Sequence, residues 1–324
     1  MLLEIEALSV RYRRLGSLES LFAPRAARYL AALRGVSLSL CAGETLGLIG
    51  ESGSGKSTLG RTIIGLERAF AGSIRFDGRE LVGLSEGPYR AVRREIAMIF
   101  QDSVASLSPR QSVYQLIVEP FVIHGHGGRS LKTRAAELLE AVGLPVSMLS
   151  AHPHQLSGGE ARRVGIARAL ALEPRIILAD EPTAGLDVSV QGEIVNLMNQ
   201  LQEQRGIAYL LITHNLSIAR HACDRLAILY RGSICETGPA ERVLSNPLHP
   251  YTDALLRSTP HADPLRRREV EIAEDDGSRP SDGCPFSRCC RHAADRCRSE
   301  FPELRDLGAH RRVRCHFPLT ATHA

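Results

Sequence analysis

The sequence lacks the long apolar runs that membrane spans need. No window holds about 18 consecutive apolar residues, and the first residues carry neither the basic flank nor the apolar stretch of a signal peptide. We therefore expect a cytoplasmic protein that does not itself cross a membrane. Its 324 residues, 44% of them hydrophobic and 23% charged, are enough for about two folded units with a buried core.

A large excess of charge of one sign is also missing. The net charge is only +4, so a basic face for nucleic acid would have to be local, and we find no such stretch. Nucleic acid is therefore not an expected partner. Lysine is scarce as well: it occurs only at Lys56 and Lys132, while arginine carries the remaining positive charge. A lysine that stands in a motif is therefore informative, and Lys56 does.

Cysteine is sparse until the last part of the chain, where five of the eight lie: Cys284, Cys289, Cys290, Cys297 and Cys315. A reducing cytoplasm disfavours structural disulfides. This group of cysteines therefore indicates a metal or iron–sulfur site.

Hydrophobic periodicity predicts an α/β protein. Alternation at residues 3–11 and 36–40 predicts an antiparallel opening sheet, and residues 13–34 between them, with Pro24, are interpreted as an irregular inserted loop. Further strands are expected at 45–49, 96–100, 175–179, 207–213 and 225–230, and helices at 57–66, 111–124, 130–142, 160–172 and 188–204. This order favours a mainly parallel core sheet covered on both faces.

The most specific motif is a phosphate-binding loop. Gly50-Glu51-Ser52-Gly53-Ser54-Gly55-Lys56-Ser57 matches G-x-x-x-x-G-K-[ST] and lies between a predicted strand and a predicted helix. In such a loop, backbone N–H groups and the helix N-terminus surround the phosphates. Lys56 would neutralise the β- and γ-phosphates, and the Ser57 hydroxyl would bind Mg²⁺.

A second motif supplies carboxylates. The apolar strand at 175–179 ends in Asp180 and Glu181. A carboxylate at a strand tip suits Mg²⁺, so Asp180 is the candidate metal ligand. Glu181, one residue further, is the candidate general base that activates the attacking water.

Between these two motifs, Leu156-Ser157-Gly158-Gly159-Glu160 resembles the signature of ATP-binding cassette (ABC) ATPases. The family's remaining motifs follow in the same order, at Gln101, at Ala184-Gly185-Leu186-Asp187 and at His214. The resemblance implies an ABC cassette over residues 1–260, with a helical subdomain at about 103–160. It also implies an ATP site shared between two subunits, in which Ser157, Gly158 and Gly159 of one chain cap the γ-phosphate bound by the other.

The same resemblance assigns further roles. His214 would contact the γ-phosphate, and Gln101 would sense Mg²⁺ or the attacking water. Tyr12 would stack on adenine, and Thr58 and Asp187 complete the implied ATP site. The sequence departs from the family pattern in three places: Glu160 replaces glutamine, Ala184-Gly185 replaces Ser-Ala, and Asn215 replaces aspartate. The charge of Glu160 would weaken phosphate binding at the signature by less than ~1 kcal/mol.

A closer resemblance is to the ATPase subunits of oligopeptide/dipeptide and nickel import systems. It rests on residues 50–61, 100–110 and 187–191, and above all on 246–256, Asn-Pro-Leu-His-Pro-Tyr-Thr-Asp-Ala-Leu-Leu. It implies an ATPase at the cytoplasmic face of the inner membrane that drives import through two permease subunits, with a solute-binding protein outside. Peptide is the expected solute and nickel the alternative. A second, distinct ATPase is the expected partner, a homodimer being the alternative, and Gln101 with residues 102–110 would couple to the permease.

The last part of the chain extends this resemblance. Residues 261–283 are expected to form a linker, and residues 284–324 a small Cys-rich appendage. In this family, four cysteines of that region can hold a [4Fe–4S] cluster, here Cys284, Cys290, Cys297 and Cys315. Cys289 is the spare and could exchange roles with Cys290. Four thiolates suit zinc equally well, and a tail without metal is the third possibility.

Two rival functions are open to test. A soluble ABC ATPase of DNA repair or translation would carry tandem cassettes, a coiled-coil insertion or a basic arm, none of which the sequence shows. A nucleotide-gated metal or redox sensor would bind ATP without appreciable turnover. The presence of Glu181 and His214 argues against that sensor.

Overall fold

The computed structural model describes residues 1–13, 29–102, 106–125, 130–258 and 282–319. Much of the expected inserted loop, part of the expected coupling segment 102–110 and most of the expected linker lie outside the described residues. Within those ranges, no helix combines the length and the apolar character that crossing a bilayer requires.

The N-terminal sheet has four strands in the order β2-β1-β4-β5, all antiparallel. They are β1 (Leu3–Arg13), β2 (Tyr29–Leu40), β4 (Ala71–Phe76) and β5 (Arg79–Glu80). The expectation of an irregular segment at 13–34 is wrong at its C-terminal end, because residues 29–34 belong to β2. Their backbone pairs with the end of β1, where Tyr12 lies opposite Leu30, and this ladder outweighs the weak local pattern.

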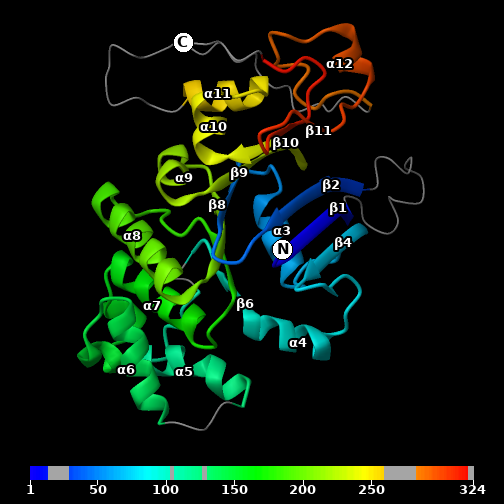
Figure 1. The fold of residues 1–324 in the computed structure, drawn as a ribbon. Coiled ribbons are helices and arrows are strands. Elements are labelled where there is room, and N and C mark those ends of the chain that lie inside the picture. Colours follow the sequence, from blue (N-terminus) through cyan, green and yellow to red (C-terminus); the bar gives the residue numbers. More distant parts are fainter. Residues whose placement is uncertain (14–28, 103–105, 126–129, 259–281, 320–324) are drawn as a thin grey trace.

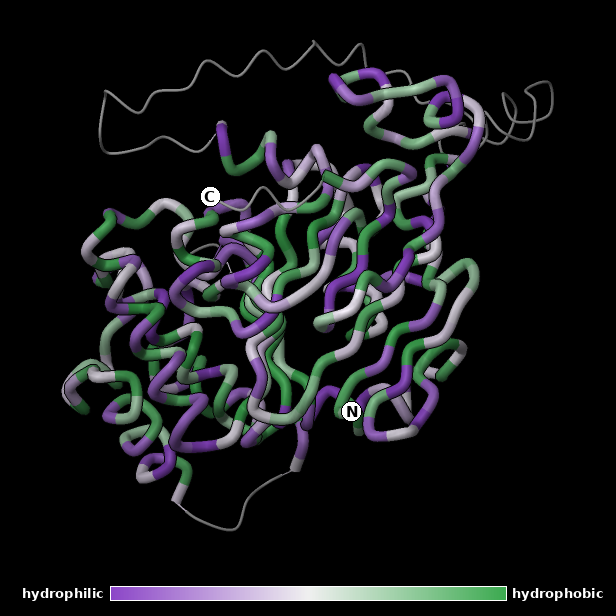
Figure 2. Tube along the Cα trace, turned by 45° about the horizontal axis from the view of Figure 1, so that its top comes forward, coloured by the Kyte–Doolittle hydropathy of each residue, from purple (hydrophilic) through white to green (hydrophobic). Residues whose placement is uncertain are grey.

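The core sheet has eight strands in the order β11-β12-β10-β9-β3-β8-β7-β6. Its centre is parallel, and the pairings of β10 with β9 and β12 are antiparallel. The bounds are β3 (Thr45–Ile49), β6 (Ile96–Ile99), β7 (Ile176–Asp180), β8 (Ala208–Thr213), β9 (Arg225–Tyr230), β10 (Ser233–Pro239), β11 (Arg305–Asp306) and β12 (Arg312–Val313). The expected antiparallel opening sheet and mainly parallel core are thus confirmed. Figure 2 shows the apolar strands running through the middle of the molecule.

Helices lie on both sides of this core sheet, α3 and α4 near the N-terminal sheet and α5 to α8 on the other side (Figure 1). Their bounds are α3 (Lys56–Ile63), α4 (Glu86–Glu95), α5 (Val113–Ile123), α6 (Leu131–Ala141), α7 (Gly158–Leu170), α8 (Val188–Arg205) and α9 (Leu216–Ala222), with the short 3-10 helices η1 (Val146–Ser150) and η2 (Pro153–Gln155). Sequence patterns predicted α3 and α5 to α8 to within a few residues and assigned no element to α4 or α9.

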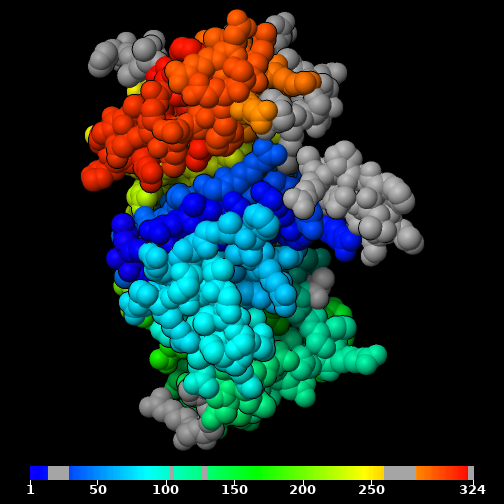
Figure 3. Space-filling view, turned by 90° about the vertical axis from the view of Figure 1, so that its right-hand side faces the viewer, coloured from blue at the N-terminus to red at the C-terminus, as the bar shows by residue number. Residues whose placement is uncertain are grey.

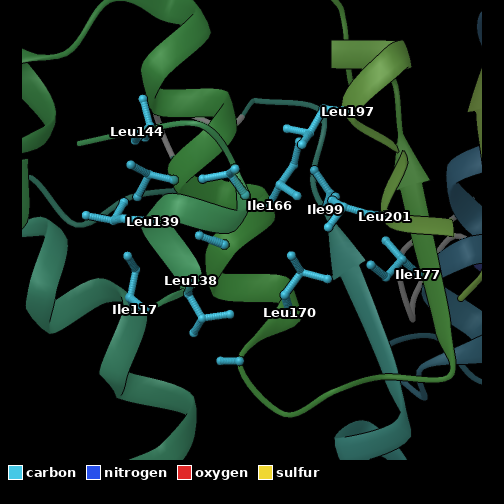
Figure 4. Packing of buried hydrophobic residues seen from close by; sticks show 14 of the residues in the cluster. Ile99, Ile117, Leu138, Leu139, Leu144, Ile166, Leu170, Ile177, Leu197 and Leu201 are labelled. Carbon is cyan, nitrogen blue, oxygen red and sulfur yellow. The ribbon is translucent and has the colours of Figure 1, made fainter. Parts of the chain in front are cut away.

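The helical layer is held by a buried apolar cluster (Figure 4). Leu138 and Leu139 of α6 face Ile166 and Leu170 of α7, and Ile117 of α5 lies beside them. At the start of α5, the Ser112 hydroxyl accepts from the backbone N–H of Gln115 in a capping box, which explains why the helix begins at residue 113. The same cluster reaches Ile177 of β7, so the helical layer is packed directly onto the strand that ends in the predicted carboxylates.

The C-terminal region is built into the core sheet. Helices α10 (Ala240–Ser245) and α11 (Pro250–Ser258) follow β10, and α12 (Asp295–Ser299) precedes β11 and β12. Strand β12 pairs with β10, so the region expected as a small appendage extends the sheet of the cassette. In Figure 3 the orange and red residues of this region cover the top of the molecule, above the blue N-terminal residues.

Candidate active site

The predicted phosphate-binding loop connects β3 to α3. Gly55 has φ 110°, and a Cβ at this position would lie 2.7 Å from the carbonyl oxygen of Ala32, so glycine is required for both conformation and space. The loop follows the carboxyl end of a central parallel strand, the usual place for a ligand in such sheets. The first turn of α3 therefore directs its N–H groups at whatever the loop binds.

Lys56 is folded back onto this loop. Its Nζ donates to the carbonyl oxygens of Gly50 at 2.7 Å and Glu51 at 2.9 Å. Burial lowers the pKa of the Lys56 ammonium, while the nearby carboxylates of Glu181 and Asp180 act in the opposite direction. The ammonium is thus held by bonds that an incoming phosphate could replace without leaving the charge unpaired.

The predicted oxygen donors for Mg²⁺, Asp180 and Ser57, are adjacent. Asp180 at the end of β7 is 3% exposed, and its side chain is hydrogen-bonded to Ser57. Burial raises the pKa of the Asp180 carboxyl, and the Ser57 contact opposes this rise. Its Oδ1 is buried without a hydrogen-bond partner among the described residues. A hydroxyl and a carboxylate with a spare oxygen form the hard oxygen set that Mg²⁺ prefers, so these residues fit the ion.

Glu181 and His214 form the candidate catalytic pair. His214 Nδ1 lies 2.6 Å from Glu181 Oε1, and Thr213 Oγ1 is 3.5 Å from Glu181 Oε2. The Glu181 side chain is 10% exposed and that of His214 67%. Glu181 has φ 50°, an unfavourable conformation for a residue with a Cβ, and its N–H donates to the carbonyl oxygen of Ile212. Backbone strain of this kind is common where a side chain must be aimed.

These elements border one cavity of about 310 Å³, a volume suited to a small ligand. It is lined by Tyr12, Leu30, Ala31, Ala32, Ser52, Gly53, Gly55, Lys56, Ser57, Thr58, Gln101, Asp180 and Glu181. The predicted nucleotide-site residues outside this lining are Gly50, Glu51, Ser54, Ser157, Gly158, Gly159, Asp187 and His214. Leu30, Ala31 and Ala32 were missed because residues 13–34 were interpreted as a loop; the apolar run from Leu30 to Leu33 was the available signal.

Tyr12 lies at the edge of this cavity. Its Oη donates to Thr58 Oγ1 at 3.4 Å, and its partial burial raises its pKa. This places an aromatic ring beside the first turn of α3. The ring and the phosphate-binding loop thus belong to the same cavity, as an adenine-stacking role requires.

The signature residues lie outside this cavity. Ser157 is the N-cap of α7: its Oγ accepts from the N–H of Glu160 at 3.3 Å and donates to Glu160 Oε2 at 2.8 Å. The backbone N–H of Ser157, which donates to Glu160 Oε2 at 2.8 Å, and then the Ser157 hydroxyl lower the pKa of the Glu160 carboxyl, which is ionised at neutral pH. A Cβ on Gly159 would lie 2.9 Å from Val190, so the turn packs closely on α8. Asp187 caps α8 by accepting from the N–H of Val190.

Arg162 ties α7 to both neighbouring loops, which sequence reasoning did not anticipate. It is 5% exposed and donates to the carbonyl oxygens of Gln101 at 3.1 Å and Ala184 at 3.0 Å. Burial lowers the pKa of its guanidinium. The arginine-rich start of α7 was the available signal, since a buried arginine needs such acceptors.

Four cysteines line a separate, small pocket: Cys284, Cys290, Cys297 and Cys315, while Cys289 is not among its lining residues. Burial raises the pKa of the Cys284 thiol to about 12 and that of Cys315 to about 11, so their thiolates would need a cation beside them. In the described part of the chain, no set of three or more His, Cys, Asp or Glu side chains is close enough to hold one metal ion.

Family comparisons agree with this geometry. Residues 33–184 match the ABC transporter family, and residues 235–297 match the oligopeptide/dipeptide transporter C-terminal region. The chain is 42% identical over 289 residues to the di/tripeptide transport ATP-binding protein DppF of Pseudomonas aeruginosa, covering 88% of this chain and 89% of the relative. It is 41% identical over 311 residues to the oligopeptide transport ATP-binding protein OppF of Escherichia coli, covering 94% and 92%.

Among solved structures, a dimeric post-hydrolysis state of the ATP-binding cassette MJ0796, bound to ADP and Pi, superposes with a TM-score of 0.65 at 30% identity, covering 74% of this chain and 98% of that one. A dimeric structure of the same cassette superposes equally well, at 29% identity, covering 74% and 98%. The chain therefore belongs to the ATP-hydrolysing, ATP-binding subunits of ABC transporters, in the oligopeptide/dipeptide branch of that family.

Proposed function

We propose that this chain hydrolyses ATP to drive import of oligopeptides or dipeptides through a separate membrane permease, nickel being the alternative solute. The observation that carries the ATPase part is the cavity in which Lys56, Ser57, Asp180 and Glu181 meet. The peptide assignment is supported by the match of residues 235–297 and by the names of the relatives.

The proposed chemistry assigns one task to each group. Lys56 would exchange its carbonyl partners for the β- and γ-phosphates of ATP. Mg²⁺, when bound by Ser57 and Asp180 with Gln101 nearby, would neutralise phosphate charge. Glu181 would take a proton from water as the water oxygen attacks the γ-phosphorus and the bond to the ADP oxygen breaks. His214, bonded to Glu181, would orient that carboxylate and contact the γ-phosphate.

The proposed active unit is a pair of cassettes. Ser157, Gly158, Gly159 and Asp187 lie outside the chain's own nucleotide cavity, which supports their acting on the ATP of a partner. The dimeric state of MJ0796 supports the same arrangement. We propose a second, distinct ATPase as the partner, a homodimer being the alternative. Two permease subunits would hold the pair at the cytoplasmic face of the membrane, with a solute-binding protein outside.

We further propose that the chain divides into a cassette at 1–260 with a helical subdomain at about 103–160, a linker at 261–283 and a Cys-rich region at 284–324. The last region would hold a [4Fe–4S] cluster, zinc being the alternative. Support comes from the four thiols around one pocket. Four thiolates suit a single zinc ion, with sulfurs at about 2.3 Å, as well as a cluster that binds each thiolate through a different iron.

ATPase activity of the full chain and of Glu181→Gln tests the main proposal. Losing the proton acceptor should lower Mg²⁺-dependent turnover by about 100-fold or more while ATP still binds. Glu137→Gln, on the exposed face of α6, is the matched control and should keep full activity. If the unaltered chain shows no ATP turnover, even with a co-purified permease, the hydrolytic mechanism is wrong and the sensor function is favoured.

The metal proposal is tested on anaerobically purified protein. An iron–sulfur cluster would give iron, sulfide and broad absorption near ~400 nm. Cys290→Ser should lose the metal and Cys289→Ser should keep it, since Cys290 lines the pocket and Cys289 does not. A colourless protein with one equivalent of zinc would show that the region binds zinc in place of an iron–sulfur cluster.

A further inference from the structure

The C-terminal region touches the phosphate-binding loop through one hydroxyl. Tyr251 in the first turn of α11 is 2% exposed, and its Oη accepts a hydrogen bond from the backbone N–H of Glu51 at 3.2 Å. Tyr251 follows Glu51 by 200 positions in sequence. This contact therefore joins the segment after β10 directly to the loop that binds phosphate.

Residue 51 is the point at which this loop is fixed from both sides. Its carbonyl oxygen accepts from Lys56 Nζ at 2.9 Å and from the N–H of Ser54 at 3.1 Å, while its own N–H donates to Tyr251. Both backbone groups of residue 51 are thus used, and the N–H is satisfied from outside the loop. Without the tyrosine hydroxyl, that partly buried N–H would lose its partner. The loop would lose one of its outer restraints, while the N–H of Gly232 would still donate to the carbonyl oxygen of Ser54 at 2.8 Å.

Tyr251 is itself held by aromatic rings. Its ring centroid lies 4.4 Å from that of Tyr230 and 5.5 Å from that of Phe286, which meets it edge-on. Its backbone N–H donates to His249 Nδ1 at 3.0 Å, which fixes the start of α11. Three neighbours from three segments therefore leave the hydroxyl little freedom to turn away from the loop.

Phe286 connects this aromatic group to the thiol pocket. It is 5% exposed and lines that pocket between Cys284 and Cys290. Its carbonyl oxygen accepts from the N–H of Cys289 in the same turn, so the ring position depends on the conformation of the cysteine-bearing segment. A continuous packed path thus runs from the thiols through Phe286 and Tyr251 to residue 51. In Figure 1, α11 and this segment lie side by side above the core strands.

We propose that Tyr251 is a positioning residue of the phosphate-binding loop and that Phe286, packed against it, lets the Cys-rich region set nucleotide affinity. This inference goes beyond the proposed function, because it gives a task to residues outside the nucleotide cavity. It requires neither a particular metal nor a particular solute.

The test compares Tyr251→Phe with Tyr209→Phe in the full chain. Tyr209 is a buried tyrosine of β8 whose hydroxyl has no hydrogen-bond partner among the described residues, so its variant removes an equivalent atom away from the loop. The readouts are the Kd for ADP, which is not consumed, the KM and kcat for ATP, and the midpoint of thermal unfolding without nucleotide.

We expect Tyr251→Phe to raise the Kd for ADP and the KM for ATP about three- to tenfold, with kcat and the unfolding midpoint unchanged. Phe286→Leu, which leaves the hydroxyl in place, should raise the same constants by a smaller factor. An unchanged Kd in Tyr251→Phe, or an equal rise in Tyr209→Phe, would overturn the positioning role. If Tyr251→Phe lowers the unfolding midpoint, Phe286→Leu decides: an unchanged Kd there would overturn the proposal.

Discussion

Individual side chains in this protein carry properties that their neighbours impose. His249 is 2% exposed, and its Nδ1 accepts from the N–H of Tyr251. The ring must therefore be neutral at that nitrogen to keep the bond. Burial lowers the pKa of His249 from 6.5 to about 4. The neutral histidine thus stabilises the fold at neutral pH, and its protonation in acid destabilises the fold.

The first prediction concerns this histidine. Because the folded-state pKa lies below the unfolded one, the unfolded chain binds more protons between pH 6.5 and about 4, and stability falls as the pH drops through that window. Relative to His249→Asn, which keeps an acceptor near Nδ1, the unaltered chain should lose about 3 kcal/mol of unfolding free energy. Denaturant unfolding at several pH values measures this difference. Parallel pH curves for the two proteins would contradict the prediction.

At the scale of elements, the N-terminus of α7 illustrates two functions of one structure. Ser157 caps the helix, and Glu160 completes the capping box. If the same end faces the phosphate of a partner, as proposed, the Glu160 carboxylate lies where an anion must approach. The serine hydroxyl is then engaged with a carboxylate that competes with phosphate.

The second prediction follows from this competition. Glu160→Gln keeps the capping geometry and removes the charge, so ATP-dependent pairing of cassettes should tighten by up to about fivefold, equivalent to less than ~1 kcal/mol. The KM for ATP, or the ATP concentration for dimer formation, measures this effect. Glu137→Gln serves as the control for a charge change elsewhere. Weaker pairing in Glu160→Gln would show that the carboxylate assists the signature.

Elements with strong local patterns were predicted from sequence, and those formed by distant pairing were not. The buried strands at 45–49, 96–100 and 207–213 have continuous apolar runs, and the structure shows them within one residue. Residues 29–34 and β12 become strands only because β1 and β10 offer them partners. Periodicity cannot report such pairing, because the partner lies far along the chain.

The residues of the candidate site, too, were predicted only where a local sequence pattern marks them. The loop at 50–57 and the carboxylates at 180–181 were identifiable because their chemistry demands fixed residue types at fixed spacing. Tyr251 lies in the stretch 246–256 that carried the family resemblance, but its positioning role and that of Arg162 were not identifiable, since each contributes through a bond to a backbone group that any residue could supply. Positioning roles of that kind depend on the fold and leave no local pattern.

At the scale of the whole molecule, one buried ion pair fastens the C-terminal region to the cassette. Glu236 of β10 is fully buried and lies 2.5 Å from Arg311. The same carboxylate accepts from the N–H groups of Leu248 and His249. It therefore joins the turn before β12, the segment before α11 and β10 itself at one point.

The third prediction is that Glu236→Ala destabilises the protein by about 3 to 5 kcal/mol, because Arg311 would remain buried without its carboxylate. Denaturant unfolding measures the loss, and faster alkylation of Cys284 would report loosening of the tail. Glu300→Ala breaks the exposed pair with Arg296 and should leave the unfolding free energy nearly unchanged, because solvent screens that pair. Equal losses in the two variants would refute the special role of the buried pair.

The place of β12 beside β10 also bears on how the chain is made. Until residue 313 has been synthesised, β10 presents an open sheet edge, for roughly 4 to 15 seconds at ordinary rates of translation. Open edges invite pairing with other chains, whereas the two-residue strand β11 leaves little to pair with once it is in place. A message truncated before the codon for Arg312 would therefore yield a complete ATP cavity on a chain prone to aggregate. Strands β11 and β12 therefore cover the open edge of β10 once they have been synthesised.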